Sequence, residues 1–569
     1  MRRSCFFLIA LASSVAANAT DTRKQEAIYD IVIHGGTVYD GSGRRARKAD
    51  VAIKGNVVVT IGKVNPVKAK SVIDARGKAV TPGFINVLSW ANESLIADGR
   101  GMSDLKQGVT LQVFGEGWSM GPYTPAMITE LKIQQVDFKY DIAWTTLGGY
   151  LDYLVARGVS PNVASFVGAT TVRMHELGAA NRKATPAEIE RMQALVRDSM
   201  LEGAMGVGSS LIYAPGNFAD TDELIALSKA ASPFGGRYIS HLRSEADNVE
   251  AAVSELIRIG RDAKIGVEMY HMKLAGQSNW GKFDAVAAQI ARAQREGLDV
   301  TANMYPYVAG ATGLDASMPP WVQADGVDAW ITRLKDPATR KRVIQEMNEK
   351  GDGWENLFFA AGDPKNLLFL GFNTPNLRPL IGKTLAEVAT MRGTSPADTI
   401  IDLVIEDKSR VSTAYFLMSE DNVRKTLKLP YVSIGSDAEA AAPEGVFLTQ
   451  STHPRAYGSF ARVLGRYVGD EKLITLSEAI RRMTSLPAKN LKLKKRGLLK
   501  PGYFADIIVF DPAKIADKAT YEAPMQYAVG VSDVLVNGVP VIKDGEHTGA
   551  TPGMVVRGPG WTGWAKDSK

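Results

Sequence analysis

The chain has 569 residues, of which 45% are hydrophobic and 22% charged, and its formal net charge is +6. These proportions are typical of a large globular protein that buries its core in more than one domain, and they exclude the fibrous and disordered classes. The small net charge and the absence of a basic run interleaved with aromatic residues argue against nucleic-acid binding.

The N-terminus has the pattern of a secretory signal peptide over residues 1–19. Two arginines precede an apolar run at 6–17, which is too short to span a bilayer, and a small-x-small cleavage site ends at Ala19. We expect cleavage after Ala19, export to the periplasm or the medium, and no stable membrane span. The only cysteine, Cys5, would be removed, so the mature chain would contain no disulfide and no thiolate metal ligand.

Short alternating strands, punctuated by glycine-containing turns, are predicted near both ends of the chain. They occupy residues 29–82 and 497–545. We predict that the two ends pair into one small antiparallel β-sandwich domain, built from residues 20–82 and 491–569.

From Gly83 onward, apolar strand segments alternate with helical patterns. This alternation predicts an α/β fold, a (β/α)8 barrel of the TIM type, over residues 83–490. The candidate barrel strands are 84–88, 110–114, 163–167, 205–209, 238–241, 267–271, 300–303 and 432–436. Two further apolar runs, 143–147 and 415–418, leave the strand count open. The rhythm is lost over about 319–393, where we expect an inserted subdomain near the site.

Two histidines end consecutive predicted strands within residues 237–273. The stretch reads strand, helix, strand, and His241 and His271 close the two strands. A right-handed crossover makes these strands parallel neighbours, so both imidazoles face the mouth at which (β/α)8 barrels hold their active sites. A single histidine at a strand end is more often an ordinary polar residue, and a pair in this position leaves a metal site and an ordinary polar role equally open until the rest of the sequence is considered.

Several long segments carry ordered polar residues that random patterning would not produce. They include YDIVIHGGTVYDGSG, VTPGFINV, YISHLRSE, IGSDAEA, THPRAYGSFARVLGRYV and KPGYFADIIVFDP. Through these segments nearly the whole mature chain resembles the amidohydrolase superfamily and, within it, the D-aminoacylase (N-acyl-D-amino-acid deacylase) family. The resemblance implies an amide hydrolase in which a zinc-bound hydroxide attacks the carbonyl and Asp437 serves as general base and then general acid.

The chain departs from this family on its first two barrel strands. Most amidohydrolases carry Asp-x-His-x-His on the first strand, and here Leu88 and Trp90 stand in place of the two histidines. Neither side chain offers a lone pair to zinc. D-aminoacylases place a cysteine ligand on the second strand, and here a glutamate follows that strand. The resemblance then implies either one zinc held by Glu116, His241 and His271, or an inactive site that has kept its pocket.

The resemblance also implies a pocket for a substrate with a free carboxylate. The matching basic and hydroxyl side chains are Tyr213, Lys273, Thr312 and Arg455. Tyr305 would polarise the scissile carbonyl, and His453 is a further pocket residue without an assigned role. The implied substrate is a small N-acyl-D-amino acid or a dipeptide with a C-terminal D-residue. Two alternatives stay open, namely hydrolysis of another amide, cyclic or L-configured, and a catalytically inactive relative that binds a carboxylate ligand.

Overall fold

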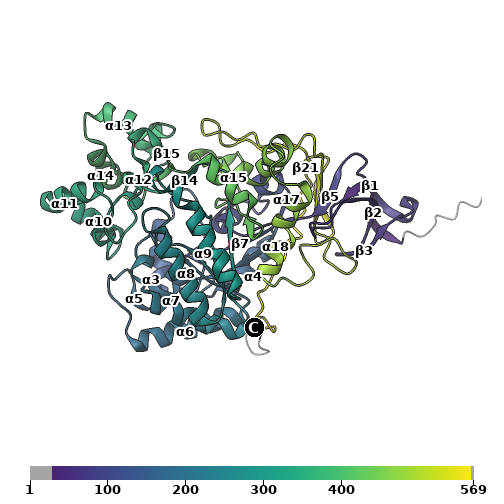
Figure 1. Cartoon of the computed structure of the whole chain (residues 1–569), viewed down its shortest axis with the longest axis horizontal. Coiled ribbons are helices and arrows are strands. Elements are labelled where there is room, and N and C mark those ends of the chain that lie inside the picture. Colours follow the sequence, from purple (N-terminus) through teal and green to yellow (C-terminus); the bar gives the residue numbers. More distant parts are fainter. Residues whose placement is uncertain (1–27, 565–569) are drawn as a thin grey trace, which may run out of the picture.

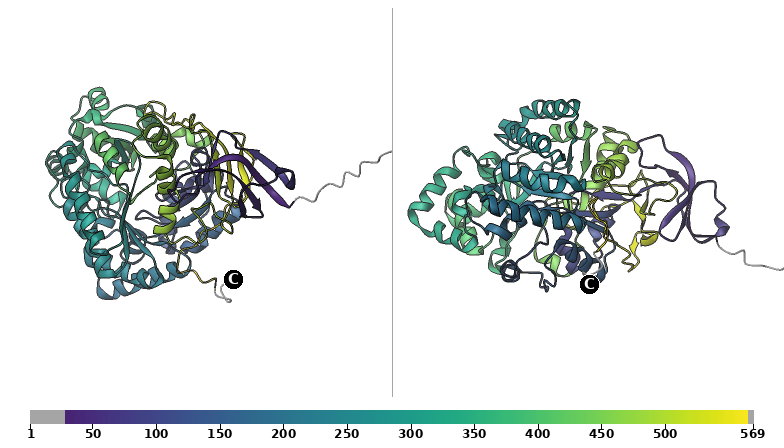
Figure 2. Two further views of the ribbon diagram at one scale, coloured as in Figure 1. Left: turned by 45° about the vertical axis from the view of Figure 1, so that its right-hand side comes forward. Right: turned by 90° about the horizontal axis from the view of Figure 1, so that it is seen from below.

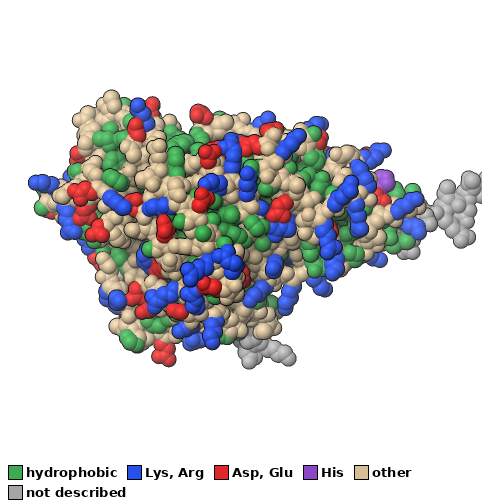
Figure 3. Space-filling model, viewed as in Figure 1, with side chains coloured by type: hydrophobic (Ala, Val, Ile, Leu, Met, Phe, Trp, Pro, Cys, Tyr) green, Lys and Arg blue, Asp and Glu red, His purple; other side chains and the backbone are tan. Residues whose placement is uncertain are grey.

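The computed structural model describes residues 28–564, and it has a barrel in the middle, a β domain at one end and an inserted lobe at the other (Figure 1). The predicted signal peptide, residues 1–19, and Cys5 lie outside the described residues. None of the described helices is both long enough and apolar enough to cross a membrane. Figure 3 shows basic and acidic side chains interspersed over the barrel and the lobe on this face.

The two ends of the chain meet in a single sheet. Its strands are β1 (Tyr29–Val38), β2 (Arg47–Lys54), β3 (Val57–Gly62), β4 (Ala69–Asp74), β5 (Ala79–Pro82), β18 (Ile507–Phe510), β19 (Val531–Val536), β20 (Val539–Lys543) and β21 (Glu546–His547). The order is β21-β20-β19-β18-β5-β1-β2-β3, and β4 pairs with β1. The junction is the antiparallel pair β5–β18.

The predicted antiparallel sandwich is not confirmed. Hydrogen bonds join all nine strands into one sheet, and β1 pairs in parallel with both β4 and β5. Strand β1 achieves this because its register shifts between Ile33 and Gly36, so that its first half lies beside β4 and its second half beside β5.

The middle of the chain forms the predicted parallel barrel. Its strands are β6 (Phe84–Asn86), β7 (Val109–Phe114), β8 (Asn162–Ser165), β9 (Val167–Gly168), β10 (Gly206–Ser210), β11 (Arg237–His241), β12 (Gly266–Met269), β13 (Val300–Met304) and β17 (Val432–Ile434). The hydrogen-bonded orders are β6-β7-β8 and β9-β10-β11-β12-β13-β17. Because β8 and β9 are consecutive parts of one strand position, the barrel has the eight positions expected from the sequence.

Backbone hydrogen bonds close the barrel between its last strand and its first. The N–H of Asp437 donates to the carbonyl of Leu88 at 2.8 Å, and the N–H of Trp90 donates to the carbonyl of Ala438 at 3.0 Å. Of the two extra apolar runs, 415–418 begins in a strand outside the barrel, and 143–147 leads into a helix.

Helices cover the outside of the barrel (Figure 2). They are α1 (Ala91–Ala97), α2 (Met102–Leu105), α3 (Pro125–Gln134), α4 (Leu147–Arg157), α5 (Ala169–Leu177), α6 (Pro186–Leu201), α7 (Thr221–Ala231), α8 (Val249–Ala263), α9 (Phe283–Arg295), α15 (Glu420–Lys428), α16 (Arg455–Arg462), α17 (Leu476–Met483) and α18 (Ser485–Asn490). Helix α8 shows why they form, since Val249, Val253, Leu256 and Ile259 recur at helical spacing and are all buried.

A lobe with its own core is inserted between β13 and β17. Its sheet has the order β14-β16-β15, with β14 (Ala309–Gly313), β15 (Leu367–Gly371) and β16 (Ser412–Phe416). Its helices are α10 (Val327–Lys335), α11 (Pro337–Met347), α12 (Leu357–Ala361), α13 (Leu385–Arg392) and α14 (Pro396–Asp407). Buried Trp330, Phe369, Ile400 and Tyr415 belong to one hydrophobic cluster. The stretch 319–393, in which the barrel rhythm is lost, lies inside this lobe.

A buried ion pair joins two of the barrel helices. Arg173 on α5 lies 2.6 Å from Glu223 on α7, and their side chains are only 1% and 4% exposed. Replacing Arg173 with methionine is expected to lower the free energy of unfolding by about 3–5 kcal/mol, because the carboxylate of Glu223 would be left buried without its partner.

Urea unfolding of the two proteins measures this loss. The double variant Arg173→Met/Glu223→Met should recover most of the stability, since no buried charge remains in it. Arg342→Met, at an exposed pair with Glu346, should change the free energy of unfolding by less than about 1 kcal/mol. A loss of similar size at both sites would contradict this account.

Candidate active site

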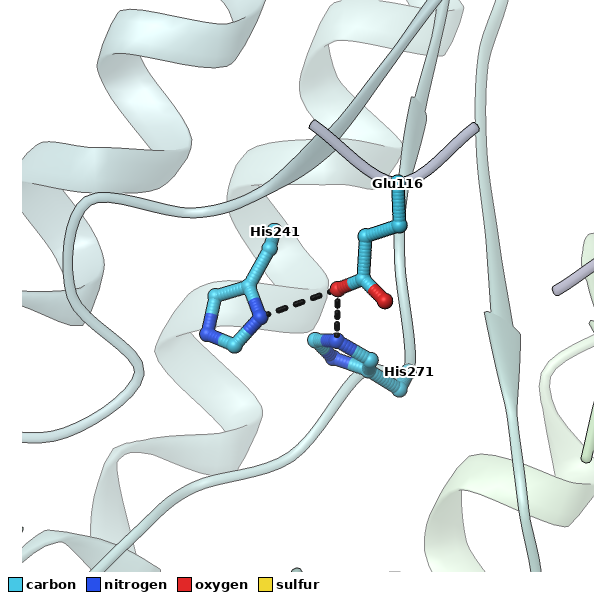
Figure 4. A group of neighbouring side chains, drawn as sticks. All are labelled: Glu116, His241 and His271. Carbon is cyan, nitrogen blue, oxygen red and sulfur yellow. Dashed lines mark hydrogen bonds and ion pairs between the residues drawn. The ribbon is translucent and has the colours of Figure 1, made fainter. Parts of the chain in front are cut away.

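Three potential metal ligands converge at the mouth of the barrel. Glu116 follows β7, His241 ends β11 and His271 follows β12. The Oε1 atom of Glu116 lies 3.0 Å from Nδ1 of His241 and 2.7 Å from Nε2 of His271, and Figure 4 shows both rings turned toward this oxygen. All three side chains are buried. The structure therefore brings together the three residues that the sequence analysis proposed as ligands.

This donor set fits a catalytic zinc ion. Two imidazoles and one carboxylate are a recurrent zinc ligand set, in which the fourth position stays open for water or substrate. Tetrahedral zinc bonds of roughly 2.0–2.2 Å place neighbouring ligand atoms about 3.4 Å apart. The two distances to Glu116 Oε1, 3.0 and 2.7 Å, are shorter, so these side chains would share an ion after a small outward shift. Within residues 28–564 this is the only group of three such side chains in this arrangement.

A second carboxylate supports the two histidines from behind. Glu245 Oε1 lies 2.9 Å from Nδ1 of His271, and its Oε2 lies 3.4 Å from Nε2 of His241. Metal-binding histidines commonly have such a carboxylate on the ring nitrogen that faces away from the metal. Burial alone would raise the pKa of Glu245, but the ammonium of Lys273 and the two histidines hold that pKa well below its usual range.

Two of the site residues have an unusual backbone conformation that sets the direction of their side chains. His271 and Asp437 have positive φ angles of 31° and 52°, a conformation that costs a non-glycine residue roughly 1–3 kcal/mol. Hydrogen bonds hold each in place, since the N–H of His271 donates to Oδ1 of Asn303 at 2.8 Å and the N–H of Asp437 donates to Leu88. Such strained residues cluster at functional sites.

Asp437 lies beside the three ligands and contacts two further side chains. Its Oδ2 is 2.6 Å from Nη1 of Arg455, and its Oδ1 accepts a hydrogen bond of 3.2 Å from the indole N–H of Trp90. The same indole N–H donates to Oε2 of Glu116 at 3.0 Å. Burial raises the pKa of Asp437, although the positive charge of Arg455 opposes that rise.

Lys273 and Arg455, the two cations proposed for the substrate carboxylate, are already paired with acidic side chains. The Nζ atom of Lys273 lies 2.7 Å from both carboxylate oxygens of Glu245. Arg455 pairs with Asp437, but its Nε has no hydrogen-bond partner. A substrate carboxylate would therefore join or displace existing ion pairs.

The other proposed pocket residues line the same mouth. The Tyr305 hydroxyl is buried without a hydrogen-bond partner, and Arg455 lies over its ring at 4.6 Å. The Tyr213 ring packs edge-on against His241 at 5.3 Å between centroids. His453 is not among the three converging side chains, and its Nε2 lies 3.0 Å from the carbonyl oxygen of Ala309. Burial holds its pKa well below the ordinary value.

A cavity of about 330 Å³ adjoins Tyr213 on the side of the inserted lobe. Its lining is largely apolar and includes Trp118, Met127, Leu131, Met174 and Trp330. Arg410 also faces it, with its guanidinium 4.7 Å from the Tyr213 ring and 2.8 Å from Oδ2 of Asp315. Thr312, a proposed pocket residue, accepts a hydrogen bond of 3.1 Å from Arg410.

The sequence analysis missed two of these residues, Glu245 and Arg410, and it noted a third, Trp90, only as the replacement of a missing metal ligand. Glu245 had a usable signal, because it follows His241 by four residues in the segment YISHLRSE. Arg410 had none, since it belongs to the lobe and reaches the mouth only through the fold. Trp90 was interpreted only as a missing ligand, and its indole N–H is in fact shared between Glu116 and Asp437.

Comparisons with known proteins give matches over most of the chain. Residues 71–542 match a family model described as "Amidohydrolase family". A D-aminoacylase of Alcaligenes xylosoxydans xylosoxydans is 32% identical over 529 residues, covering 93% of this chain and 97% of the relative.

Solved structures give the same result. The N-acyl-D-glutamate deacylase of Bordetella bronchiseptica, solved with zinc and a phosphonate mimic of the tetrahedral intermediate, matches with a TM-score of 0.77 and 30% identity, covering 93% of this chain and 99% of that one. A D-aminoacylase described as having a binuclear metal centre, with one-metal activation and second-metal attenuation, matches with a TM-score of 0.77 and 32% identity over 93% of this chain and 100% of that one.

Proposed function

This chain is a hydrolase of the amidohydrolase family, related along its length to the D-aminoacylases, and from that premise we propose that it deacylates N-acyl-D-amino acids with one bound zinc ion. The observation that carries the proposal is the convergence of Glu116, His241 and His271 beside Asp437 at the barrel mouth. We also propose that the protein is exported, which rests on the signal-peptide pattern of residues 1–19.

The three converging side chains would hold the metal. When bound, the ion would lower the pKa of a water molecule and polarise the amide carbonyl. Zinc suits a set of two imidazoles and a carboxylate. A single ion per chain is supported by Leu88 and Trp90, which offer no ligand on the first strand. The related D-aminoacylase with a binuclear centre is activated by one metal.

Asp437 is positioned to move the proton. Its carboxylate would accept a proton from the attacking water and pass it to the leaving amine. The ion pair with Arg455 and the hydrogen bond from Trp90 fix both of its oxygens. Burial and these contacts keep the group in one orientation, which general acid–base catalysis requires.

The neighbouring cations and one tyrosine would hold the substrate. The spare Nε of Arg455 and the ammonium of Lys273 would receive the carboxylate of the amino acid, Arg455 by directed hydrogen bonds and Lys273 as a point charge. The Tyr305 hydroxyl, buried and without a partner, would donate a hydrogen bond to the carbonyl oxygen as negative charge develops on it.

A substrate panel tests this proposal. The purified mature protein, loaded with zinc, should hydrolyse N-acetyl-D-amino acids at least about 100-fold faster than their L-enantiomers in kcat/KM, a preference of roughly 2.7 kcal/mol in activation free energy. Dipeptides with a C-terminal D-residue and five- and six-membered cyclic amides complete the panel. Turnover of cyclic amides or L-forms alone, or of no compound in the panel, would contradict the proposal.

Removing the Tyr305 hydroxyl should weaken the chemical step. Tyr305→Phe is expected to lower kcat by about 100-fold, the effect of losing one donor to a developing oxyanion, with KM changed by less than about threefold. Tyr307→Phe is the matched control, because that hydroxyl is also buried without a partner and has no proposed role. Equal losses in the two variants would show that the effect comes from packing.

A further inference from the structure

Trp90 lies between the proposed metal ligand Glu116 and the proposed proton carrier Asp437. One indole N–H is shared between Oε2 of Glu116, at 3.0 Å, and Oδ1 of Asp437, at 3.2 Å. We propose that Trp90 is a positioning residue whose N–H holds these two carboxylates at a fixed separation. The inference rests on the proposed function, because it concerns the same site.

The main chain places this indole between the two carboxylates. Trp90 follows β6, which pairs with β7, the strand that leads to Glu116. The segment after β6 also forms a bridge with the segment after β17, which carries Asp437. Its backbone N–H donates to the carbonyl of Ala438 at 3.0 Å. Helix α1 begins at the next residue. The indole therefore belongs to a segment whose backbone is hydrogen-bonded to the strand end that carries Asp437.

The two carboxylate oxygens of Glu116 have different partners, which would allow the residue to bind a metal ion and the indole together. Oε1 of Glu116 faces the two imidazoles, and Oε2 faces Trp90. The indole N–H thus binds the carboxylate oxygen that does not contact the imidazoles, so Oε1 would remain for a metal ion. An indole is a donor without a lone pair for metals and without a charge, so it orients Glu116 without competing for the ion.

The same N–H offsets the repulsion between two buried carboxylates. Like charges repel strongly in a site from which water is excluded, and Glu116 and Asp437 are both buried. With Arg455 bound to Oδ2 of Asp437 at 2.6 Å, the indole at Oδ1 completes the fixation of that group. The side chain that follows the first barrel strand thus donates a hydrogen bond to two groups that the proposed reaction uses.

The experiment compares Trp90→Phe with the parent protein. Zinc content, the visible absorption spectrum of the cobalt-loaded protein, kcat and KM are measured for both. We expect full metal content and a changed cobalt spectrum, because Glu116 would be less constrained. A lost hydrogen bond to charged groups should lower kcat by about 10- to 100-fold while KM changes by less than about threefold.

Two further variants separate positioning from packing. Trp90→Gln keeps an N–H donor on a side chain of similar reach and should recover part of kcat and of the cobalt spectrum. Trp321→Phe is the matched control, because it removes an indole N–H that donates to Oε2 of Glu346 at 2.9 Å in the inserted lobe. It should change neither quantity.

Each outcome decides the inference. A Trp90→Phe protein with the parent spectrum and the parent kcat would overturn it. If the parent hydrolyses no compound in the panel, the proposed function fails, and the cobalt spectrum alone decides on Trp90, a change supporting the inference and an unchanged spectrum overturning it. If Trp90→Phe does not fold, the ¹⁵N-labelled indole resonances of the parent and of Asp437→Asn are compared, and the absence of any shifted indole N–H would overturn the inference.

Discussion

Replacing Glu116 with alanine is expected to remove the metal and abolish hydrolysis. Of the three side chains that converge at the mouth, Glu116 is the one whose Oε1 contacts both imidazoles. Two histidines alone leave an incomplete ligand set for zinc. The zinc content should fall from about one ion per chain to below about 0.1 after dialysis, and kcat/KM should fall by more than about 1,000-fold.

The melting temperature gives an independent measure of the loss of zinc binding. A ligand present at 100 times its Kd stabilises the folded state by about 2.7 kcal/mol, so added zinc should raise the melting temperature of the parent but not of Glu116→Ala. Glu296→Ala, at an exposed pair with Arg292, should behave like the parent in all three measurements. A Glu116→Ala protein that keeps its zinc would refute the proposed ligand set, and a parent that binds none would favour the metal-free, ligand-binding alternative.

Asp437→Asn should distinguish the proposed proton carrier from the proposed metal site. The variant keeps the size of the side chain but cannot accept the proton, and kcat should fall by about 100- to 10,000-fold, the usual range for removal of a general acid–base group. Zinc content should stay at about one ion per chain, because Asp437 is not among the three converging ligands.

A matched control exists in the β domain. Asp506 forms an ion pair with Arg496 whose side chains are 11% and 7% exposed, against 10% and 6% for Asp437 and Arg455. Asp506→Asn should therefore lose a similar amount of stability but keep kcat within about threefold. If Asp437→Asn retained more than about a tenth of the parent kcat, another group would have to carry the proton.

The fold was predictable where local patterns decide it. The strand-helix-strand pattern that ends on His241 and His271 indicated parallel neighbours, and the structure pairs β11 with β12 in parallel. The barrel followed because each βα unit repeats the same local alternation. The antiparallel sandwich is not confirmed, because alternation shows that a segment is a strand but not which strand pairs with it. The register shift in β1 near Gly36 places its two halves beside different partners.

The site was predictable only in part, for a similar physical reason. His241 and His271 have a signal in their own strands, and Glu116 could be proposed from the family pattern. The contacts of Trp90 depend on how three strand ends face one another, and one of its partners lies 347 residues away in the chain. Arg410 comes from the inserted lobe, whose docking against the mouth no local pattern describes.

The pairing of β5 with β18 has a consequence for the order of folding. During synthesis, the whole barrel must be made before β18 is available to pair with the edge of β5. Contacts between segments so distant in the sequence form slowly. Until then an unpaired strand edge is exposed, which is a site for association with other chains. The β domain would thus be among the last parts to mature, and nascent or truncated chains that end before Ile507 should be prone to aggregate.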